Sequence, residues 1–190
     1  MKRIILLILS IALILPILLV YVSSDDNTVN LYDESAKMKQ TKVDKSFSVQ
    51  FTAKESFNSI EVFVADTSAK KTNFKLSLYK WNINYQTTLK DPPIISEDIS
   101  TELEKNKFFL WNLERNIPDA GEYVVHIDKP DSGTLSVNIT EITYSKARLY
   151  ESNLARGGNI EMRIKYTGNG KDLGDISANN QFLFDDFGRF

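Results

Sequence analysis

The chain has 190 residues, a formal net charge of −2 and no cysteine. This length fits one domain of ordinary size, large enough to bury a real core. A nearly neutral chain with scattered lysines lacks the positive field that binding to a phosphate backbone requires, so we expect no nucleic-acid partner. The lack of cysteine excludes disulfides, a thiolate nucleophile and a cysteine zinc site, so packing must stabilise the fold.

The N-terminus combines positive charge with a long apolar run. Lys2 and Arg3 precede residues 4–22, which carry no charge. This order places the start in the cytoplasm and everything after the run outside it. At roughly 1.5 Å per residue the run just reaches the ~30 Å of a hydrocarbon core, which is long for a signal peptide and short for a comfortable span. Residues 1–24 are therefore either a cleaved signal peptide or a membrane anchor, and both place the body outside the cytoplasm.

The next segment differs from the rest of the chain in its pattern. Residues 25–45 are polar and charged without a sustained period, which predicts a tether, in which a short extended piece around Val29 and Leu31 is able to pair with the sheet. From residue 46 apolar and polar residues alternate, a pattern typical of antiparallel strands with one buried face. The alternation recurs over residues 47–53, 60–64, 74–78, 109–113, 123–127, 135–139 and 160–166. Only residues 99–107 have helical character.

Clusters of proline, aspartate and glycine separate several of these runs. They lie at residues 117–121, 129–133 and 156–159, where each can supply the backbone angles of a turn. We predict an all-β fold, an antiparallel β-sandwich or jelly roll of about eight strands over residues 46–167. It follows the N-terminal signal or anchor helix.

The C-terminal segment, residues 168–190, no longer alternates. It ends in QFLFDDFGRF, with phenylalanine at 182, 184, 187 and 190. Rings at this density predict that the stretch Phe182–Phe190 docks, either on the sandwich or on a protein partner.

Three segments carry a resemblance to a known type of module. They are Ser48–Ala53, the stretch LSLYKWNINYQTTLKDPPI from Leu76 to Ile94, and AGEYVVHI from Ala120 to Ile127. With the closing strand at Tyr166, about two thirds of the chain resembles the galactose-binding, carbohydrate-binding-module type of β-sandwich, found in secreted bacterial proteins and often beside glycoside hydrolases. The resemblance implies a non-catalytic module that binds a polysaccharide or a surface glycan.

The ring-rich loop after the strand at 74–78 is the best candidate site. Tyr79, Trp81 and Tyr85 offer aromatic faces for sugar C–H groups, and the amides of Asn82 and Asn84 suit sugar hydroxyls. The alternative is structural: Trp81 caps the end of the sandwich and Tyr85 anchors the loop.

The remaining candidates are weaker. Asp128 and Asp131 flank a turn and can offer carboxylates to a structural calcium ion, although aspartates also favour such turns by their own hydrogen bonds. His126, the only histidine, alternates outward as a surface residue, and Trp111 belongs to the core. No other cofactor is expected.

Three functions compete on this basis. The first is a non-catalytic, extracytoplasmic carbohydrate-binding or accessory module on the bacterial cell surface. The second is a cell-surface or envelope domain that binds another protein. The third and weakest is a small glycoside hydrolase, because 25 acidic residues guarantee some close pairs but a sandwich with short loops offers little cleft.

Overall fold

The described part of the chain folds into antiparallel β-sheets. In a computed structural model, the structure describes residues 27–68, 71–118 and 120–177. Within these ranges the only helix is α2 (Tyr85–Thr88). No helix in the described ranges is long and apolar enough to cross a membrane. The predicted signal or anchor at residues 1–24 lies outside them.

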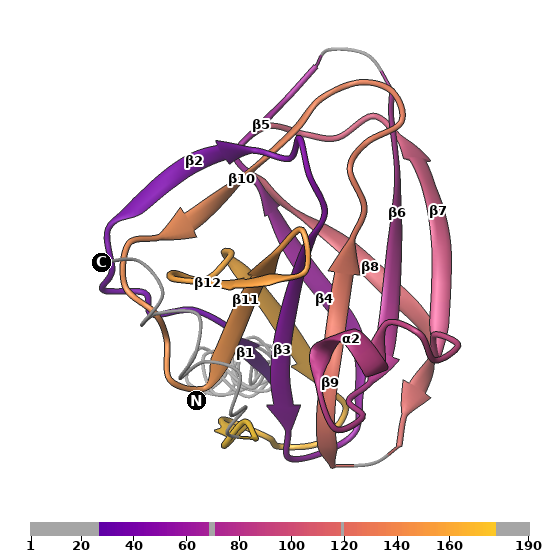
Figure 1. Ribbon diagram of the computed structural model, residues 1–190, viewed down its shortest axis with the longest axis vertical. Coiled ribbons are helices and arrows are strands. Elements are labelled where there is room, and N and C mark those ends of the chain that lie inside the picture. The colour runs from indigo at the N-terminus through magenta and orange to yellow at the C-terminus, as the bar shows by residue number, and fades with distance from the viewer. Residues whose placement is uncertain (1–26, 69–70, 119, 178–190) are drawn as a thin grey trace, which may run out of the picture.

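Two main sheets build the fold (Figure 1). The four-stranded sheet runs in the order β1 (Thr28–Asn30), β13 (Met162–Tyr166), β4 (Phe57–Val64) and β8 (Lys107–Ile117). The seven-stranded sheet runs in the order β12 (Leu154–Arg156), β11 (Ala147–Glu151), β3 (Phe47–Ala53), β9 (Gly121–Ile127), β6 (Thr72–Lys80) and β7 (Ile95–Thr101), and β14 (Leu173–Gly174) pairs with β3. A smaller sheet joins β2 (Met38–Lys42), β10 (Leu135–Thr140) and β5 (Asp66–Thr67).

The two main sheets share one hydrophobic core between them. The rings of Phe51 on β3 and Phe57 on β4 meet edge to face at 5.8 Å, and those of Phe74 on β6 and Phe109 on β8 do so at 6.0 Å. Trp111 is 1% exposed, as predicted for a core residue, and its Nε1 donates to Glu97 at 2.7 Å. Because inward residues of both sheets interdigitate in this way, the architecture is sandwich-like and all-β. The seven-stranded sheet stands in front in Figure 1, with α2 on its outer side.

All seven predicted alternating runs lie in or overlap strands, and the predicted turns lie between them. Gly158 shows why the turn at 156–159 needs glycine. Its φ is +84°, and a Cβ added there would come within 2.1 Å of the carbonyl oxygen of Thr140. The strand β13 follows directly after this turn.

The sequence predictions differ from the structure in three segments. Much of the tether predicted at residues 25–45 is part of the fold, because β1 and β2 pair with β13 and β10 and Leu31 is fully buried. The segment read as helical, 99–107, holds the end of β7 and the first residue of β8. The domain also continues past residue 167, since β14 pairs with the end of β3.

Candidate functional site

The predicted ring-rich loop contains α2 and is shaped by its own polar side chains. Asn84 caps the helix, and its Oδ1 accepts from the backbone N–H of Thr87 at 2.9 Å. The Nδ2 of Asn82 donates to the carboxylate of Asp91 at 2.8 Å, and its backbone N–H donates to the hydroxyl of Thr88 at 2.9 Å. Both amides predicted to bind a ligand therefore make hydrogen bonds inside the loop.

The rings of this loop pack on the outer side of the seven-stranded sheet. Tyr85 is only 3% exposed, and its ring stacks on that of Tyr150 with centroids 4.0 Å apart and planes 8° apart. Trp81 and Tyr79 are half-buried against them. We call the whole group the α2 cluster: Tyr79, Trp81, Tyr85, Leu89, Val124, Tyr150 and Ala155. This arrangement corresponds to the alternative in which Tyr85 anchors the loop, because its ring faces inward and offers no exposed aromatic face to a sugar.

A chain of hydrogen bonds lies beneath Tyr85. The hydroxyl of Ser48 is 2.8 Å from the hydroxyl of Tyr85 and 2.6 Å from Nδ1 of His126, and Nε2 of His126 is 3.1 Å from the carboxylate of Asp128. A carboxylate only accepts, so Nε2 of His126 donates to Asp128. The Ser48 hydroxyl bridges His126 and Tyr85, and the chain fastens α2 to β3 and β9.

This chain contains the atom types of a serine hydrolase, but its geometry is that of a structural network. Ser48 is 0% exposed, and its hydroxyl is hydrogen-bonded to that of Tyr85, which is itself only 3% exposed. His126 alternates outward as predicted, yet its side chain is only 12% exposed because the loop covers it. A serine that no substrate can reach is unable to act as a nucleophile.

A second buried network supports the partner ring. The hydroxyl of Tyr150 donates to Oε1 of Gln50 at 2.7 Å, and Nε2 of Gln50 donates to Glu122 at 2.5 Å. Glu122 also accepts from the backbone N–H of Ser177 at 2.8 Å and from its hydroxyl. Each buried polar group of this network is therefore paired, which is the condition for such a network to stabilise a fold.

Burial of the α2 cluster changes the acidity of its tyrosine. Removal from water raises the pKa of Tyr85 to about 12, and the hydrogen bond with Ser48 only partly opposes this shift. The neutral phenol is the form that the cluster accommodates.

The α2 loop leaves one large apolar side chain in water. Ile83 is 81% exposed and has a φ of +55°, a conformation that a β-branched residue rarely adopts. Trp81 beside it keeps part of its ring accessible. The exposed surface of this region is therefore partly apolar, and one atom of each amide, Nδ2 of Asn82 and Oδ1 of Asn84, is engaged inside the loop.

The predicted calcium ligands Asp128 and Asp131 lie in the turn between β9 and β10. Asp128 contacts His126, and Asp131 lies at an exposed turn where its backbone N–H donates to Asn73 at 2.9 Å. Across the residues that the structure describes, no three histidine or acidic side chains are grouped as metal ligands. Calcium binds six to eight oxygens, so these two aspartates do not make a calcium site by themselves.

An open groove lies at a different place, between the edge of the four-stranded sheet and the segments that lead into β11 and β14. Its volume is about 340 Å³, which is within the range of small-molecule sites. Its lining comes from three parts of the chain: Thr28, Val29, Asn30, Tyr32, Asp33, Glu34, Tyr144, Lys171 and Asp172. We call this feature the β1 groove.

The β1 groove combines tyrosine rings with carboxylates. Burial, and then the charges of Glu161 and Glu34, raise the pKa of Tyr32 to about 12; burial and Asp172 also raise the pKa of Tyr144. The hydrogen bond from the Lys54 ammonium lowers the pKa of Asp172. Its carboxylate is thus held ionised at the rim of the groove.

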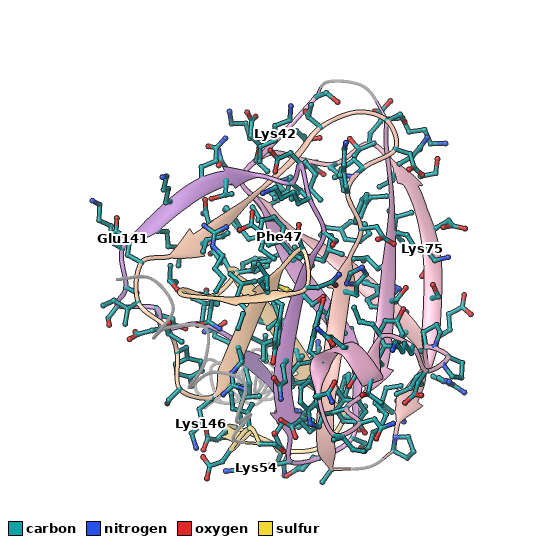
Figure 2. All side chains as sticks on the ribbon, in the orientation of Figure 1. Lys42, Phe47, Lys54, Lys75, Glu141 and Lys146 are labelled. Carbon is teal, nitrogen blue, oxygen red and sulfur yellow. The ribbon has the colours of Figure 1, made fainter. Side chains whose placement is uncertain are left out.

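Charged residues continue around this end of the molecule. Lys54 pairs with Asp172 at 3.0 Å and Lys146 pairs with Asp175 at 2.7 Å. Figure 2 shows Lys54 and Lys146 at the same end of the fold. Both pairs are exposed to solvent, so they shape the rim more than they stabilise the domain.

Sequence reasoning missed the groove because its lining residues are far apart in the chain. Most of them lie in the segment 28–34, which has no alternation and was expected to be a tether. It also missed Tyr150 as the partner of Tyr85. The apolar Val29 and Leu31 inside the polar segment predict a short extended piece, which β1 confirms, but they do not indicate a concave surface.

Comparison of the chain with protein-family models, with curated proteins and with solved structures finds no match. The resemblance to galactose-binding modules thus rests on the sequence motifs alone. The class that the structure itself defines is an antiparallel, sandwich-like all-β domain with one closed ring cluster and one open polar groove.

Proposed function

We propose that this protein is a non-catalytic, extracytoplasmic binding module for saccharides, with a jelly-roll-like fold of the galactose-binding type. The observation that supports this function best is the β1 groove, an open concavity of about 340 Å³ lined by two tyrosines, an asparagine and several carboxylates. Sugars present hydroxyls that such groups bind and apolar C–H faces that pack on rings. Binding needs no bond to be made or broken.

The charge of the lining narrows the ligand to neutral or basic saccharides. Asp33, Glu34 and Asp172 contribute three carboxylates and Lys171 one ammonium, and the ammonium of Lys54 pairs with Asp172 at the rim, so these charges sum to −1. An acidic polysaccharide would bring like charges together at close range, which is unfavourable. Neutral glycans avoid this cost and still gain hydrogen bonds to charged acceptors.

The location of the protein follows from its N-terminal segment. Residues 4–22 carry the signal or anchor, and Thr28, the first residue of β1, comes six residues after the run. Six extended residues span at most about 20 Å. If residues 4–22 remain as an anchor, the β1 groove faces ligands close to the membrane surface.

Isothermal titration calorimetry of the full chain with neutral oligosaccharides tests the proposal. We expect heat of binding with at least one neutral glycan and none with polygalacturonate. Replacing Glu34 by glutamine keeps the shape of the side chain and its acceptor for Asn30, but removes the charge. Loss of a charge-assisted hydrogen bond should weaken binding roughly tenfold to a hundredfold.

Glu104→Gln is the matched control, because Glu104 is an exposed glutamate that pairs with Lys107 in the segment between β7 and β8. It should bind as the unmodified chain does. The proposal fails if no neutral glycan binds, or if both variants weaken binding equally.

A further inference from the structure

The last described residues bring the chain to the α2 cluster. Ser177 donates twice to the carboxylate of Glu122, and the backbone N–H of Trp81 donates to the carbonyl of the same Glu122 at 2.9 Å. Ser177 and Trp81 are therefore held by one residue. Residues 178–190, which lie outside the described residues, thus follow a residue that is held close to the loop that carries α2.

The solvent side of this loop is apolar and only partly covered. Ile83 is 81% exposed, and Trp81, Tyr79 and Leu89 are half-buried. We call this surface the α2 face. Ile83 on this face has a backbone in the left-handed region and projects a large side chain into water. This arrangement costs free energy unless another apolar group covers the side chain.

The final segment has the composition and the reach to cover this surface. Residues 181–190 contain four phenylalanines and Leu183. Phe182 is five positions after Ser177, so their Cα atoms are at most about 18 Å apart. The first rings can thus reach Trp81 and Ile83 without unfolding any described strand.

Charges of the two surfaces are complementary. Asp185 and Asp186 lie in the middle of the segment, and the exposed Lys90 follows α2 at the end of the loop. Opposite charges at the rim of an apolar contact favour one orientation of the docked segment.

From these observations we infer that residues 181–190 dock on the α2 face of their own chain. The contact places phenylalanine rings against Trp81 and Ile83. It makes the ring-rich loop a docking surface for the C-terminus instead of a saccharide site. The inference stands whether or not the β1 groove binds a saccharide.

Engineered disulfides test this contact directly, because the chain has no cysteine of its own. The double variant Ile83→Cys, Phe184→Cys is made in the full chain and oxidised at low protein concentration. We expect an intramolecular disulfide, seen by non-reducing electrophoresis and mass spectrometry. It should form about tenfold faster than in the control pair Leu110→Cys, Phe184→Cys, because docking raises the effective concentration of the thiols.

Leu110 suits the control because it is 53% exposed on β8, in the opposite sheet. Equal rates in the two pairs, or a disulfide that forms only between two chains, would overturn the inference.

A second measurement does not depend on cysteines. Deleting residues 181–190 should increase acrylamide quenching of tryptophan fluorescence, which reports Trp81 because Trp111 is 1% exposed; unchanged quenching argues against docking.

Discussion

The α2 cluster and the β1 groove both contain tyrosines, three in the cluster and two in the groove, yet they are built in opposite ways. In the cluster, Tyr85 and Tyr150 stack on each other, and their hydroxyls are hydrogen-bonded to Ser48 and Gln50 respectively. In the groove, tyrosines from distant segments stand around an open volume with carboxylates between them. Both features join separate segments of the chain, but in the cluster a ring from β11, Tyr150, covers Tyr85 and closes the surface, whereas the groove stays open.

The largest expected effect is the loss of the buried ring at the centre of the cluster. Replacing Tyr85 by alanine removes a stacked ring that is 3% exposed and leaves Ser48 with one partner fewer. We expect the free energy of unfolding to fall by about 3–5 kcal/mol. Urea denaturation measures it, as a lower midpoint with an unchanged slope.

Tyr85→Phe is the matched control, because it keeps the ring and removes only the hydroxyl. It should cost about 1 kcal/mol and leave the affinity of the β1 groove for a glycan unchanged. A loss below about 1 kcal/mol for Tyr85→Ala would show that the stacked geometry contributes little to stability.

The next largest expected effect is a loss of folding stability at high pH, caused by ionisation of the same tyrosine. The pKa of Tyr85 is about 12 in the folded chain, above the ordinary value of 10 for an exposed tyrosine. The folded state therefore holds this proton more tightly, and its contribution to stability is complete below pH 10 and lost as the pH rises through 12. The loss amounts to about 2–3 kcal/mol at the upper end.

Urea denaturation at a series of pH values from about 9 to 12 measures this loss. Tyr32, whose pKa is also about 12, contributes a loss in the same direction, so Tyr85→Phe should flatten the curve without abolishing it. Identical pH dependence in the Tyr85→Phe variant and the unmodified chain would rule out Tyr85 as a source.

The fold was largely readable from the sequence because long strands with one buried face leave a period of two. The strand β4 illustrates this, since its buried residues Ile60, Val62 and Val64 alternate with less buried neighbours. The strand β7 lacks that signal. Only Ile99 is fully buried among its seven residues, so its pattern resembles a short helix as much as a strand.

The site was less readable, for two physical reasons. The period places Tyr79 on the outer face of β6, but it does not tell whether a loop covers that face, and here Tyr85 and Tyr150 do. The groove needs a contact between residues 28–34 and Tyr144, which are more than a hundred positions apart. Such long-range contacts are decided by the whole packing and leave no local pattern.

The smallest expected effect is the response of the melting temperature to calcium, which tests the turn at 128–131. The carboxylate of Asp128 holds His126 at 3.1 Å, and no third acidic or histidine side chain joins the two aspartates in the described part of the chain. Adding calcium or a chelator should therefore shift the melting temperature by less than about 1 °C.

The most informative variant to compare with the unmodified chain is Asp128→Asn. Its side chain still accepts a hydrogen bond from His126 but carries no charge. If calcium stabilises the unmodified chain by several degrees and this variant no longer responds, the turn binds the ion despite its sparse ligands. If neither chain responds, Asp128 serves to orient His126, and through it Ser48 and Tyr85, so that even this turn contributes to closing the α2 cluster.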